Sequence, residues 1–281
     1  MMKRAKIWLL IATFLMILGM AVFGAVMFAC QWDFTKLETK IYNTNTYQIT
    51  EDFHNFSINA NTADIVFALS TDGSCSVVCY EEENIHHSVS VEEDTLVIQA
   101  LDERSWQDHI GINFGSSKIT LYLPHGEYLS LVIRESAGEV YIPEAFQFRD
   151  VDIHVSTGNI EFSSSVSGDL KLHTTTGNVR AKNLSAGSLE LSTSTGKLFL
   201  ENVIVSGSLC AKTDTGDIRL DACDAENIQI QTDTGEITGT LLSPKIFIAK
   251  SDTGKIHVPQ TTTGGRCEVT TDTGDIKLEI A

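Results

Sequence analysis

Four Asp-Thr-Gly triplets are the residues of this 281-residue chain whose types most directly suggest chemistry. They begin at Asp214, Asp233, Asp252 and Asp272. The same triplet supplies the paired carboxylates of aspartic proteases, which sit about 3 Å apart in a closed cleft and share a proton. Here each triplet is followed by a polar residue and another short segment, so the four carboxylates are expected along one exposed edge. The triplets therefore predict turns, with no catalytic residues and no enzyme.

The same row of acids leaves two alternatives open for the aspartates. Each could accept hydrogen bonds from the amides of its own turn. Alternatively, the row, with Asp217, Glu236 and Asp275 nearby, could bind Ca²⁺, which takes several carboxylate and carbonyl oxygens. A polysaccharide lyase would also need a basic residue beside such a cluster, in a groove. No Arg or Lys cluster stands beside these acids, which argues against a lyase. We expect no metal site and no cofactor.

Cysteine and histidine near residue 80 form the second group that could do chemistry. In a strand, Cys75 and Cys79 would share a face about 13 Å apart at ~3.3 Å per residue, too far for a disulfide. His86 and His87 would complete a zinc ligand set, but adjacent side chains of a strand point in opposite directions. We therefore expect buried or half-buried thiols here, and six cysteines in 281 residues are too few for a disulfide framework.

A repeat must position all of these residues. From residue 131 onward a glycine recurs at spacings of 20, 19, 19, 20, 19, 19 and 20 residues, after Ser, Thr or Asp and a small residue. These glycines are Gly138, Gly158, Gly177, Gly196, Gly216, Gly235, Gly254 and Gly274. A short fixed period predicts a solenoid, because one repeat cannot bury its apolar row without neighbours. Thr157, Thr176, Thr195, Thr215, Thr234, Thr253 and Thr273 are then expected to stack as a ladder.

The columns beside each glycine identify the repeat as β-structure. The residue two positions after the glycine is aliphatic in all eight copies and the residue between is polar, which is the alternation of a half-buried strand. Ile218 and Ile237 are thus predicted to be buried, with Asp217 and Glu236 exposed. A third short segment adds four further inward positions, Leu184, Val203, Cys223 and Leu242. Residues 246–249 do not alternate, which predicts a bulge.

The fold class predicted is all-β: a single-stranded parallel β-helix, or β-solenoid, of about 19- to 20-residue coils, preceded by one transmembrane helix. The eight repeats occupy residues 131–281. Residues 30–130 form an irregular β-rich part that caps the solenoid, with strands expected at 56–59, 65–68, 89–91, 96–98 and 119–124. Residues 61–65 resemble a degenerate copy of the repeated turn. The acidic runs at 81–83 and 92–94 are expected to be solvated loops, and residues 102–117 a longer loop.

The first 29 residues predict a membrane anchor. Residues 7–29 are uncharged and apolar, long enough at ~1.5 Å per residue to cross the ~30 Å hydrocarbon layer. The basic tail, residues 1–6, should stay cytoplasmic, which places everything after residue 30 outside in a single-pass cell-membrane protein. A cleaved signal peptide and lipidation at Cys30 are the alternatives. The net charge of −17 repels phosphate backbones, so no nucleic-acid partner is expected.

An anchor, irregular strands, an Ile-Thr-Leu-Tyr-Leu-Pro segment at 119–124 and repeated Thr-Gly-Asx-Ile turns occur here in that order. Residues 40–281 resemble the bacterial DUF4097 family, a group of candidate adhesins with β-strand repeats. The resemblance implies a β-solenoid ectodomain at the cell envelope, with some relatives linked to envelope-stress operons. It carries no catalytic motif, so no site residues are transferred.

We expect a non-catalytic binding module for cell-wall polymer or glycan. The alternatives are a structural or signalling platform for another envelope protein and, less favoured, a polysaccharide-acting enzyme. The sequence stops at a strand-like segment with its aliphatic row inward and no cap after it. A homodimer through residues 274–281 is therefore a further possibility, opposed by the net negative charge.

Overall fold

The computed structural model describes residues 2–33, 41–104 and 115–281. Helix α1 (Met2–Ala29) belongs to one compact unit, and residues 42–103 and 116–281 form the other. Within α1, Lys6–Ala29 is the stretch long and apolar enough to cross a membrane, with a mean hydropathy of 2.5. That length and composition suit a membrane anchor or a signal sequence. The loop expected at 102–117 lies largely outside the described residues.

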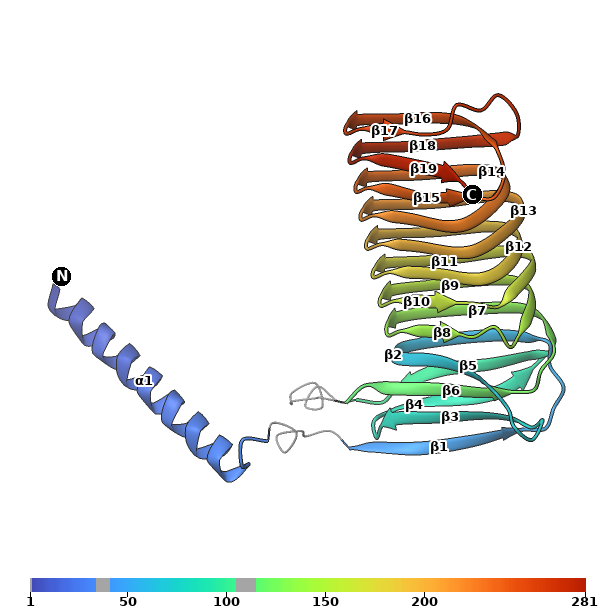
Figure 1. Cartoon of the computed structure of the whole chain (residues 1–281). Coiled ribbons are helices and arrows are strands. Elements are labelled where there is room, and N and C mark those ends of the chain that lie inside the picture. Colours follow the sequence, from blue (N-terminus) through green and yellow to red (C-terminus); the bar gives the residue numbers. More distant parts are fainter. Residues whose placement is uncertain (1, 34–40, 105–114) are drawn as a thin grey trace. The chain divides into compact units, whose positions relative to one another are not determined.

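The second unit is a β-solenoid-like stack of parallel strands (Figure 1). Partner residues on neighbouring coils lie 19 or 20 positions apart, as in Thr176 with Thr195 and Thr195 with Thr215. The strands of the stack are β7 (Glu127–Ala137), β8 (Val140–Ile142), β9 (Gln147–Thr157), β10 (Ile160–Phe162), β11 (Ser165–Thr176), β12 (Val179–Thr195), β13 (Leu198–Thr215), β14 (Ile218–Thr234), β15 (Ile237–Leu241), β16 (Lys245–Thr253), β17 (Ile256–His257), β18 (Gly265–Thr273) and β19 (Ile276–Ile280).

The core runs along the axis of the stack. Ile218 and Ile237 are fully buried, while Glu236 is exposed and Asp217 half-buried, which confirms the predicted alternation. Similar residues stack in register from coil to coil, so that each turn covers the apolar row of the next: Leu170, Leu189, Leu209, Ile228 and Cys267 form one such column. Burial of this continuous column supplies the main stabilisation that a single coil lacks.

Glycine is required at the corner because neighbouring backbones nearly touch there. Gly177 has φ +147°, and a Cβ built on it would overlap the carbonyl oxygen of Gly158 on the preceding coil. Gly196 stands in the same relation to Gly177, with φ +155°. Any side chain would force these coils apart, so the repeat of glycine reflects close stacking as well as positive φ.

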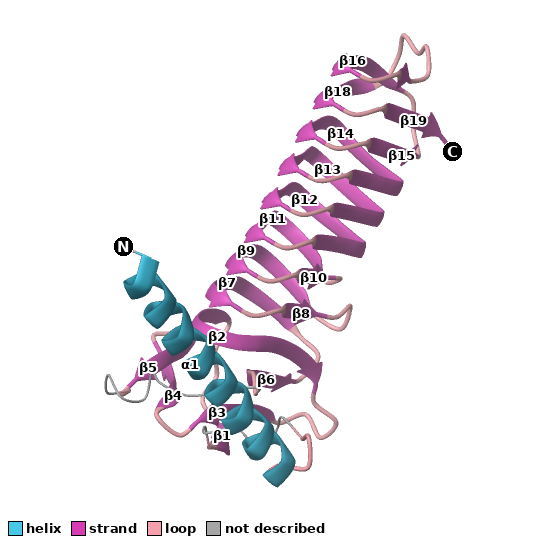
Figure 2. Ribbon diagram, turned by 90° about the vertical axis from the view of Figure 1, so that its left-hand side faces the viewer, coloured by secondary structure: helices cyan, strands magenta, loops and turns pink. Residues whose placement is uncertain are grey.

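The coils do not stack in the order of the sequence. Strand β18 pairs with β14 on one side and with β16 on the other, and β19 lies likewise between β15 and β17. The coil of Gly274 is therefore inserted between the coils of Gly235 and Gly254, and β16 and β17 form the end of the stack (Figures 1 and 2). The expected open end at 274–281 is wrong, because β19 pairs with β15 along its whole length and its Ile276 and Lys277 pair with β17 on the other side. The homodimer itself stays a prediction.

This order explains why residues 246–249 do not alternate. Ile246, Ile248 and Ile256 are 44%, 47% and 45% exposed on the terminal coil, which has no neighbour to cover it. The bulge predicted there is wrong, since Lys245–Thr253 pairs with Gly265–Thr273 without a register shift. Leu242 is also wrong as an inward residue. The coil of β15 is one residue shorter after Gly239 than the coil of β14 is after Leu220, so Leu241 takes the place beside Cys223.

Six strands form the other end: β1 (Tyr42–Ile49), β2 (Asn55–Leu69), β3 (Cys75–Glu82), β4 (Ile85–Glu92), β5 (Thr95–Asp102) and β6 (Ser117–Leu123). Strand β2 is the first coil, because its two halves pair with β7 and β8. Residues 61–65 thus occupy the repeated turn, as predicted. On its other side β2 pairs with β5 and β6, which antiparallel β4 and β3 extend (Figure 2).

The acidic runs of this region differ from each other. Glu93 and Asp94 form the tight turn between β4 and β5, with φ +46° and +70°, so the loop predicted at 92–94 is confirmed in its turn residues. At 81–83 the prediction is wrong, because Glu81 and Glu82 are buried at the end of β3. The partners that permit burial of Glu81 are His87 and Asn45, which the local sequence does not reveal.

Candidate functional site

One side of the stack carries a row of outward side chains, most of them large, from seven successive coils. Each stands three residues after a corner glycine, and strand pairing places them next to one another from coil to coil. The row reads Tyr141, Glu161, Arg180, Phe199, Arg219, Thr238 and Lys277. We call the surface formed by this row and the outward residues two positions further on the arginine face. Parallel pairing in register is what brings residues 136 positions apart onto one continuous strip.

Arg180 and Phe199 form the centre of the arginine face. The guanidinium carbon of Arg180 lies 5.0 Å from the centroid of the Phe199 ring, within the range of a cation–π contact. Arg219 flanks Phe199 on the next coil. Among the arginines whose side chains the structure describes, Arg134, Arg149 and Arg266 are paired with carboxylates, whereas Arg180 and Arg219 have no ion pair. Two guanidinium groups thus remain available to a ligand beside an aromatic ring.

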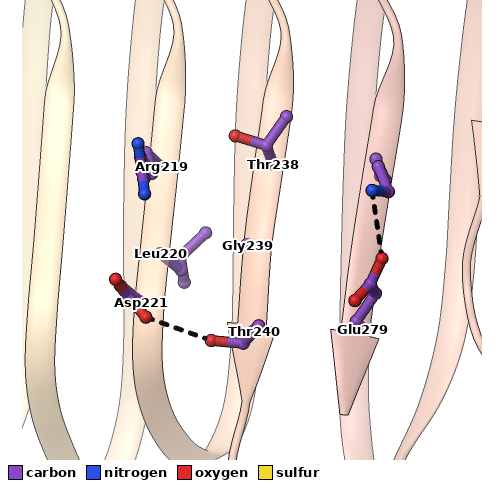
Figure 3. Close-up of a pocket in the computed structure, with 8 residues that line it drawn as sticks. Arg219, Leu220, Asp221, Thr238, Gly239, Thr240 and Glu279 are labelled. Atoms are coloured by element: carbon purple, nitrogen blue, oxygen red, sulfur yellow. Dashed lines mark hydrogen bonds and ion pairs between the residues drawn. The ribbon is translucent and has the colours of Figure 1, made fainter. Parts of the chain in front are cut away.

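The second row of this face contains three carboxylates, and each has an ion pair or a hydrogen bond with a neighbouring side chain. Glu201 Oε1 lies 3.3 Å from Lys182 Nζ, and Glu279 Oε1 lies 3.1 Å from Lys277 Nζ. Asp221 accepts a 3.4 Å hydrogen bond from the Thr240 hydroxyl (Figure 3). These contacts hold the rim of the face in place while leaving the arginines free.

Three shallow hollows follow one another along the arginine face. The first, of about 360 Å³, is lined by Glu139, Tyr141, Asn159, Glu161, Asn178 and Arg180. The second, of about 310 Å³, lies between Arg180 and Arg219 over Phe199. The third, of about 200 Å³, lies over Gly239, where the other coils carry larger residues (Figure 3). Because neighbouring hollows share Arg180 and Arg219, they form one open trough parallel to the axis of the stack.

Asn and Asp residues fix the backbone that borders this trough. Asn159 Oδ1 accepts a 2.9 Å hydrogen bond from the backbone N–H of Asn178, whose own Oδ1 accepts a 2.8 Å bond from Lys197. Asp217 and Asp275 make the same contact to Glu236 and Lys255. At these four corners the Asx residue of the Thr-Gly-Asx-Ile pattern therefore ties one coil to the next.

A larger hollow of about 680 Å³ lies elsewhere, near His54, Tyr128 and Arg149. Its basic groups are already paired: His54 Nδ1 lies 2.7 Å from Asp94 Oδ1, and Arg149 Nε lies 2.8 Å from Asp150 Oδ2. Glu127 also lines the hollow. Because these groups already have partners, the trough is the better candidate for a binding site.

The four Asp-Thr-Gly aspartates lie on a different edge, as expected. They are exposed, and adjacent coils bring them together in the order Asp214, Asp233, Asp272, Asp252. None of these four described side chains accepts a hydrogen bond from its own turn, so that expectation is wrong; Asp252 instead pairs with Lys250 at 2.8 Å. The predicted threonine ladder is present, with Thr253 stacked beyond Thr273.

A second, inner ladder of threonines satisfies backbone carbonyl oxygens at the corners, whereas the aspartates were expected to accept from amides. A buried threonine lies three residues before the glycine, and its hydroxyl donates to the glycine carbonyl of the preceding coil. The bonds run from Thr174, Thr193, Thr213, Thr232 and Thr271, at 2.9–3.1 Å. The signal for this ladder is present in the sequence as a column of inward threonines.

The residues considered as zinc ligands separate into two groups. Cys79 and His87 are buried, whereas Cys75 is half-buried and His86 faces Glu103 with its Nε2 3.9 Å from Oε1. The structure adds Glu81, which sequence reasoning missed, to Cys79 and His87. All six cysteines are free thiols.

The arginine face was also missed, although its signal was available. Reading the column three residues after each glycine shows Tyr, Glu, Arg, Phe and Arg in succession, where a solvated face would carry small polar residues.

Three solved structures illustrate how the fold compares with known proteins. A candidate adhesin from Bacteroides fragilis is 19% identical, covering 87% of this chain and 99% of its own, with a TM-score of 0.53. A candidate adhesin from Parabacteroides distasonis is 12% identical over 87% and 98%, with a TM-score of 0.47. A candidate lipid-binding protein from the same species is 15% identical over 85% and 97%, with a TM-score of 0.38. The first of these shares the fold.

Among proteins with curated descriptions, none matches this sequence. The profile of one family does match, over residues 53–241 and 204–281, which together take in the first coil, the whole repeat and the inserted coil. The chain therefore belongs to the DUF4097 family, described as Toastrack DUF4097.

Proposed function

We propose that the protein is a membrane-anchored, non-catalytic binding module that holds a linear envelope polymer or glycan in the trough of the arginine face. One observation carries the proposal: an open trough that combines an aromatic ring with two guanidinium groups that have no ion pair. A polymer chain can follow a trough that runs along a stack of coils, and the coils repeat at the ~4.8 Å spacing of neighbouring strands.

The chemistry of the trough indicates a ligand with both sugar rings and acidic groups. Tyr141 and Phe199 offer flat apolar faces for the C–H surface of a sugar ring. Arg180 and Arg219 offer paired N–H donors that match carboxylate or phosphate oxygens. The trough also carries five carboxylates, from Glu139, Glu161, Glu201, Asp221 and Glu279. An acidic polymer would therefore bind through direct contacts with the two guanidinium groups, against the net charge of −17.

We propose a non-catalytic role because carboxylates of the trough already have partners within the protein. Glu201 and Asp221 lie on adjacent coils, but each is held by a neighbour, Lys182 or Thr240. The trough is also open along its length, whereas glycoside hydrolysis and elimination favour sites that exclude water. A shallow, rigid surface suits retention of a polymer.

The anchor in this proposal is α1. Residues 7–29 would cross the cell membrane once, with Lys3, Arg4 and Lys6 in the cytoplasm and residues from 30 onward outside. The solenoid would then face the wall or glycan layer. Adhesin-like names among proteins of similar fold agree with a surface role.

Sedimentation with isolated cell wall tests the proposal. Detergent-solubilised full-length protein is mixed with purified wall, and the bound fraction is measured by quantitative immunoblot. We expect Phe199→Ala and the pair Arg180→Gln with Arg219→Gln to reduce binding at least about tenfold, equal to about 1.4 kcal/mol. Lys212→Gln, an exposed unpaired residue of β13 on another face, is the matched control.

Two results would contradict this assignment. Equal loss of binding in the Lys212→Gln control would indicate a nonspecific charge effect. Full wall binding by a variant that combines Phe199→Ala, Arg180→Gln and Arg219→Gln would show that the arginine face is not the binding site.

A second candidate function is a platform for another envelope protein. One observation favours it: Ile246, Ile248 and Ile256 expose apolar surface on the terminal coil, whose outer strand edge is also unpaired. Co-purification from membranes in mild detergent, compared between the native chain and Ile248→Lys, separates the two candidates. A partner lost in that variant while wall binding persists would support the platform.

A further inference from the structure

Three side chains with metal-ligand chemistry converge in the capping strands, far from the arginine face. Cys79 and Glu81 stand two residues apart on β3 and so share a face, and His87 comes from β4. They are 0%, 1% and 2% exposed. One sulfur, one carboxylate oxygen and one imidazole nitrogen all lie within 4.8 Å of one another. A fully buried carboxylate requires partners, and the imidazole of His87 is one of them.

Neighbouring residues hold this cluster in position. Glu81 Oε2 accepts a 2.9 Å hydrogen bond from the backbone N–H of His87 and lies 2.6 Å from its Nδ1. Glu81 Oε1 accepts a 2.7 Å bond from the Asn45 amide. The Tyr47 hydroxyl donates to the His87 carbonyl at 2.9 Å. Strand β1 therefore supplies two polar groups that orient the cluster from outside, as supporting residues do around metal ligands.

One atom of the cluster has no partner. His87 Nε2 is buried and makes no hydrogen bond. An unpaired buried nitrogen costs roughly 1–3 kcal/mol in either protonation state. A buried Glu81–His87 pair by itself explains Nδ1 and leaves Nε2 unexplained. Nor does the Glu81–His87 pair account for the buried thiol of Cys79 beside it.

We propose that Cys79, Glu81 and His87 bind a divalent cation of the zinc class. Sulfur and imidazole ligands select Zn²⁺ and similar transition-metal ions over Ca²⁺ and Mg²⁺, which prefer oxygen. A thiolate and a carboxylate together neutralise the two charges of the cation, which suits a buried position. Three protein ligands leave one tetrahedral position for water or another donor.

Binding requires only a small adjustment of the cluster. Ligand atoms about 2.0–2.3 Å from a tetrahedral Zn²⁺ lie roughly 3.3–3.8 Å from each other. With His87 Nδ1 as the ligand, its 2.6 Å contact with Glu81 Oε2 must open by about 1 Å, and a separation of 4.8 Å must close by about 1–1.5 Å. The Cys79 proton, and any second imidazole proton, are released to solvent as the cation binds.

The test uses full-length protein in detergent, freed of metal with a chelator and then titrated with Zn²⁺ or Co²⁺. We expect one equivalent to bind, the melting temperature to rise, and Co²⁺ to give a thiolate-to-metal charge-transfer band. Cys79→Ser should abolish the band, and both Cys79→Ser and His87→Gln should weaken zinc binding about 100-fold or more, since even supporting residues account for 10–100-fold. Cys75→Ser and His86→Gln are matched controls from the same strands and should bind as the native chain does.

Some outcomes overturn the proposal. If native protein binds no Zn²⁺ and its melting temperature ignores both metal and chelator, Glu81 and His87 form a structural pair only. If the Cys75→Ser or His86→Gln control loses binding equally, the ligands are wrongly assigned. Because the native titration needs no variant, the proposal stays testable even if His87→Gln fails to fold.

Discussion

Lys245 Nζ lies 2.6 Å from Asp224 Oδ1, although the two residues belong to strands separated by an inserted coil. Lys245 is 4% exposed at the start of β16, and its ammonium group also donates to Ser243 at 2.7 Å. Gly265, its partner on β18, has no side chain to obstruct this reach. The ion pair thus ties the terminal coil to β14 across the inserted coil.

Breaking this ion pair should loosen the terminal coil. We expect Lys245→Met to lower the free energy of unfolding by about 3 kcal/mol, because Asp224 then keeps a partly buried charge without its partner. Hydrogen exchange should rise in residues 245–257 before the rest of the stack. Lys250→Met, which removes the exposed pair with Asp252, is the control and should have little effect, because water already screens that pair. Equal effects of the two substitutions would contradict a special role for Lys245.

Glu135 should make stability depend on pH. It occupies the inward position that threonine holds in later coils, and burial raises its pKa from 4.5 to about 7, with the Asp64 charge contributing and the backbone N–H groups of Ala137 and Ala63 opposing. Between pH 4.5 and 7 the folded chain keeps a proton that the unfolded chain has released. Stability therefore falls as pH rises through this window, by up to about 3 kcal/mol.

Denaturant unfolding at a series of pH values measures this effect. Other groups contribute their own pH dependence, so the comparison is with Glu135→Gln and with Glu135→Thr, which restores the residue type of the later coils. Both variants should lack the component between pH 4.5 and 7. An unchanged profile in both would show that Glu135 does not titrate in that range.

A corner glycine in the middle of the stack should tolerate no side chain. Gly196→Ala places a methyl group against the Gly177 carbonyl and imposes a positive φ on alanine, so we expect a loss of about 4 kcal/mol or more. Thr195→Ala, the exposed neighbour, should stay within about 1 kcal/mol. Thermal unfolding of both proteins decides the matter, and a mild effect at Gly196 would mean that the coils can separate locally.

Ala222 offers the opposite test, a substitution expected to stabilise. It has φ +52°, in the same corner as Asn183 and Asn202 at +52° and +53°, and asparagine adopts this conformation more readily than alanine. The amide of Asn202 already donates to Asn183 at 3.0 Å, so Ala222→Asn should extend that ladder and add about 1 kcal/mol. Ala222→Val should destabilise instead, because a branched side chain clashes at positive φ. The opposite ranking in chemical denaturation would refute this account.

Substitutions at two adjacent residues of β15 test which side chains face the core. Ile237→Ala should cost about 2–5 kcal/mol, since Ile237 is fully buried, while Glu236→Ala should stay within about 0.5 kcal/mol. Equilibrium unfolding of the two variants compares adjacent residues of one strand. Similar losses would place both side chains in equivalent surroundings.

The period of the glycines was enough to predict the coil, its inward row and the threonine ladder, because each depends on residues within one repeat. The order of the coils depends on which repeat pairs with which, and every corner presents the same backbone to its neighbours. The sequence marked the exception only through Ile246–Ala249, whose loss of alternation fits an uncovered end better than a bulge.

The candidate sites were less predictable for a related reason. Arg180 and Phe199 are neighbours only after the register is known, and Glu81 is buried only because His87 and Asn45 approach from other strands. An acidic tripeptide read alone favours solvent. The local pattern therefore predicted an exposed Glu81, whereas its contacts with His87 and Asn45 bury it.

The out-of-order coil has a consequence for how the chain reaches its final form. Strands β16 and β17 leave the ribosome, and any translocation channel, before β18 and β19, yet they dock only on those later strands. Coils up to β15 can add one by one as they emerge. The last coils cannot add in the order of synthesis, because β16 and β17 find their partners only when β18 and β19 are present. Once β18 and β19 have paired with β14 and β15, the earlier segment can fold over them. Residues 245–257 are therefore expected to be the last part of the stack to become protected.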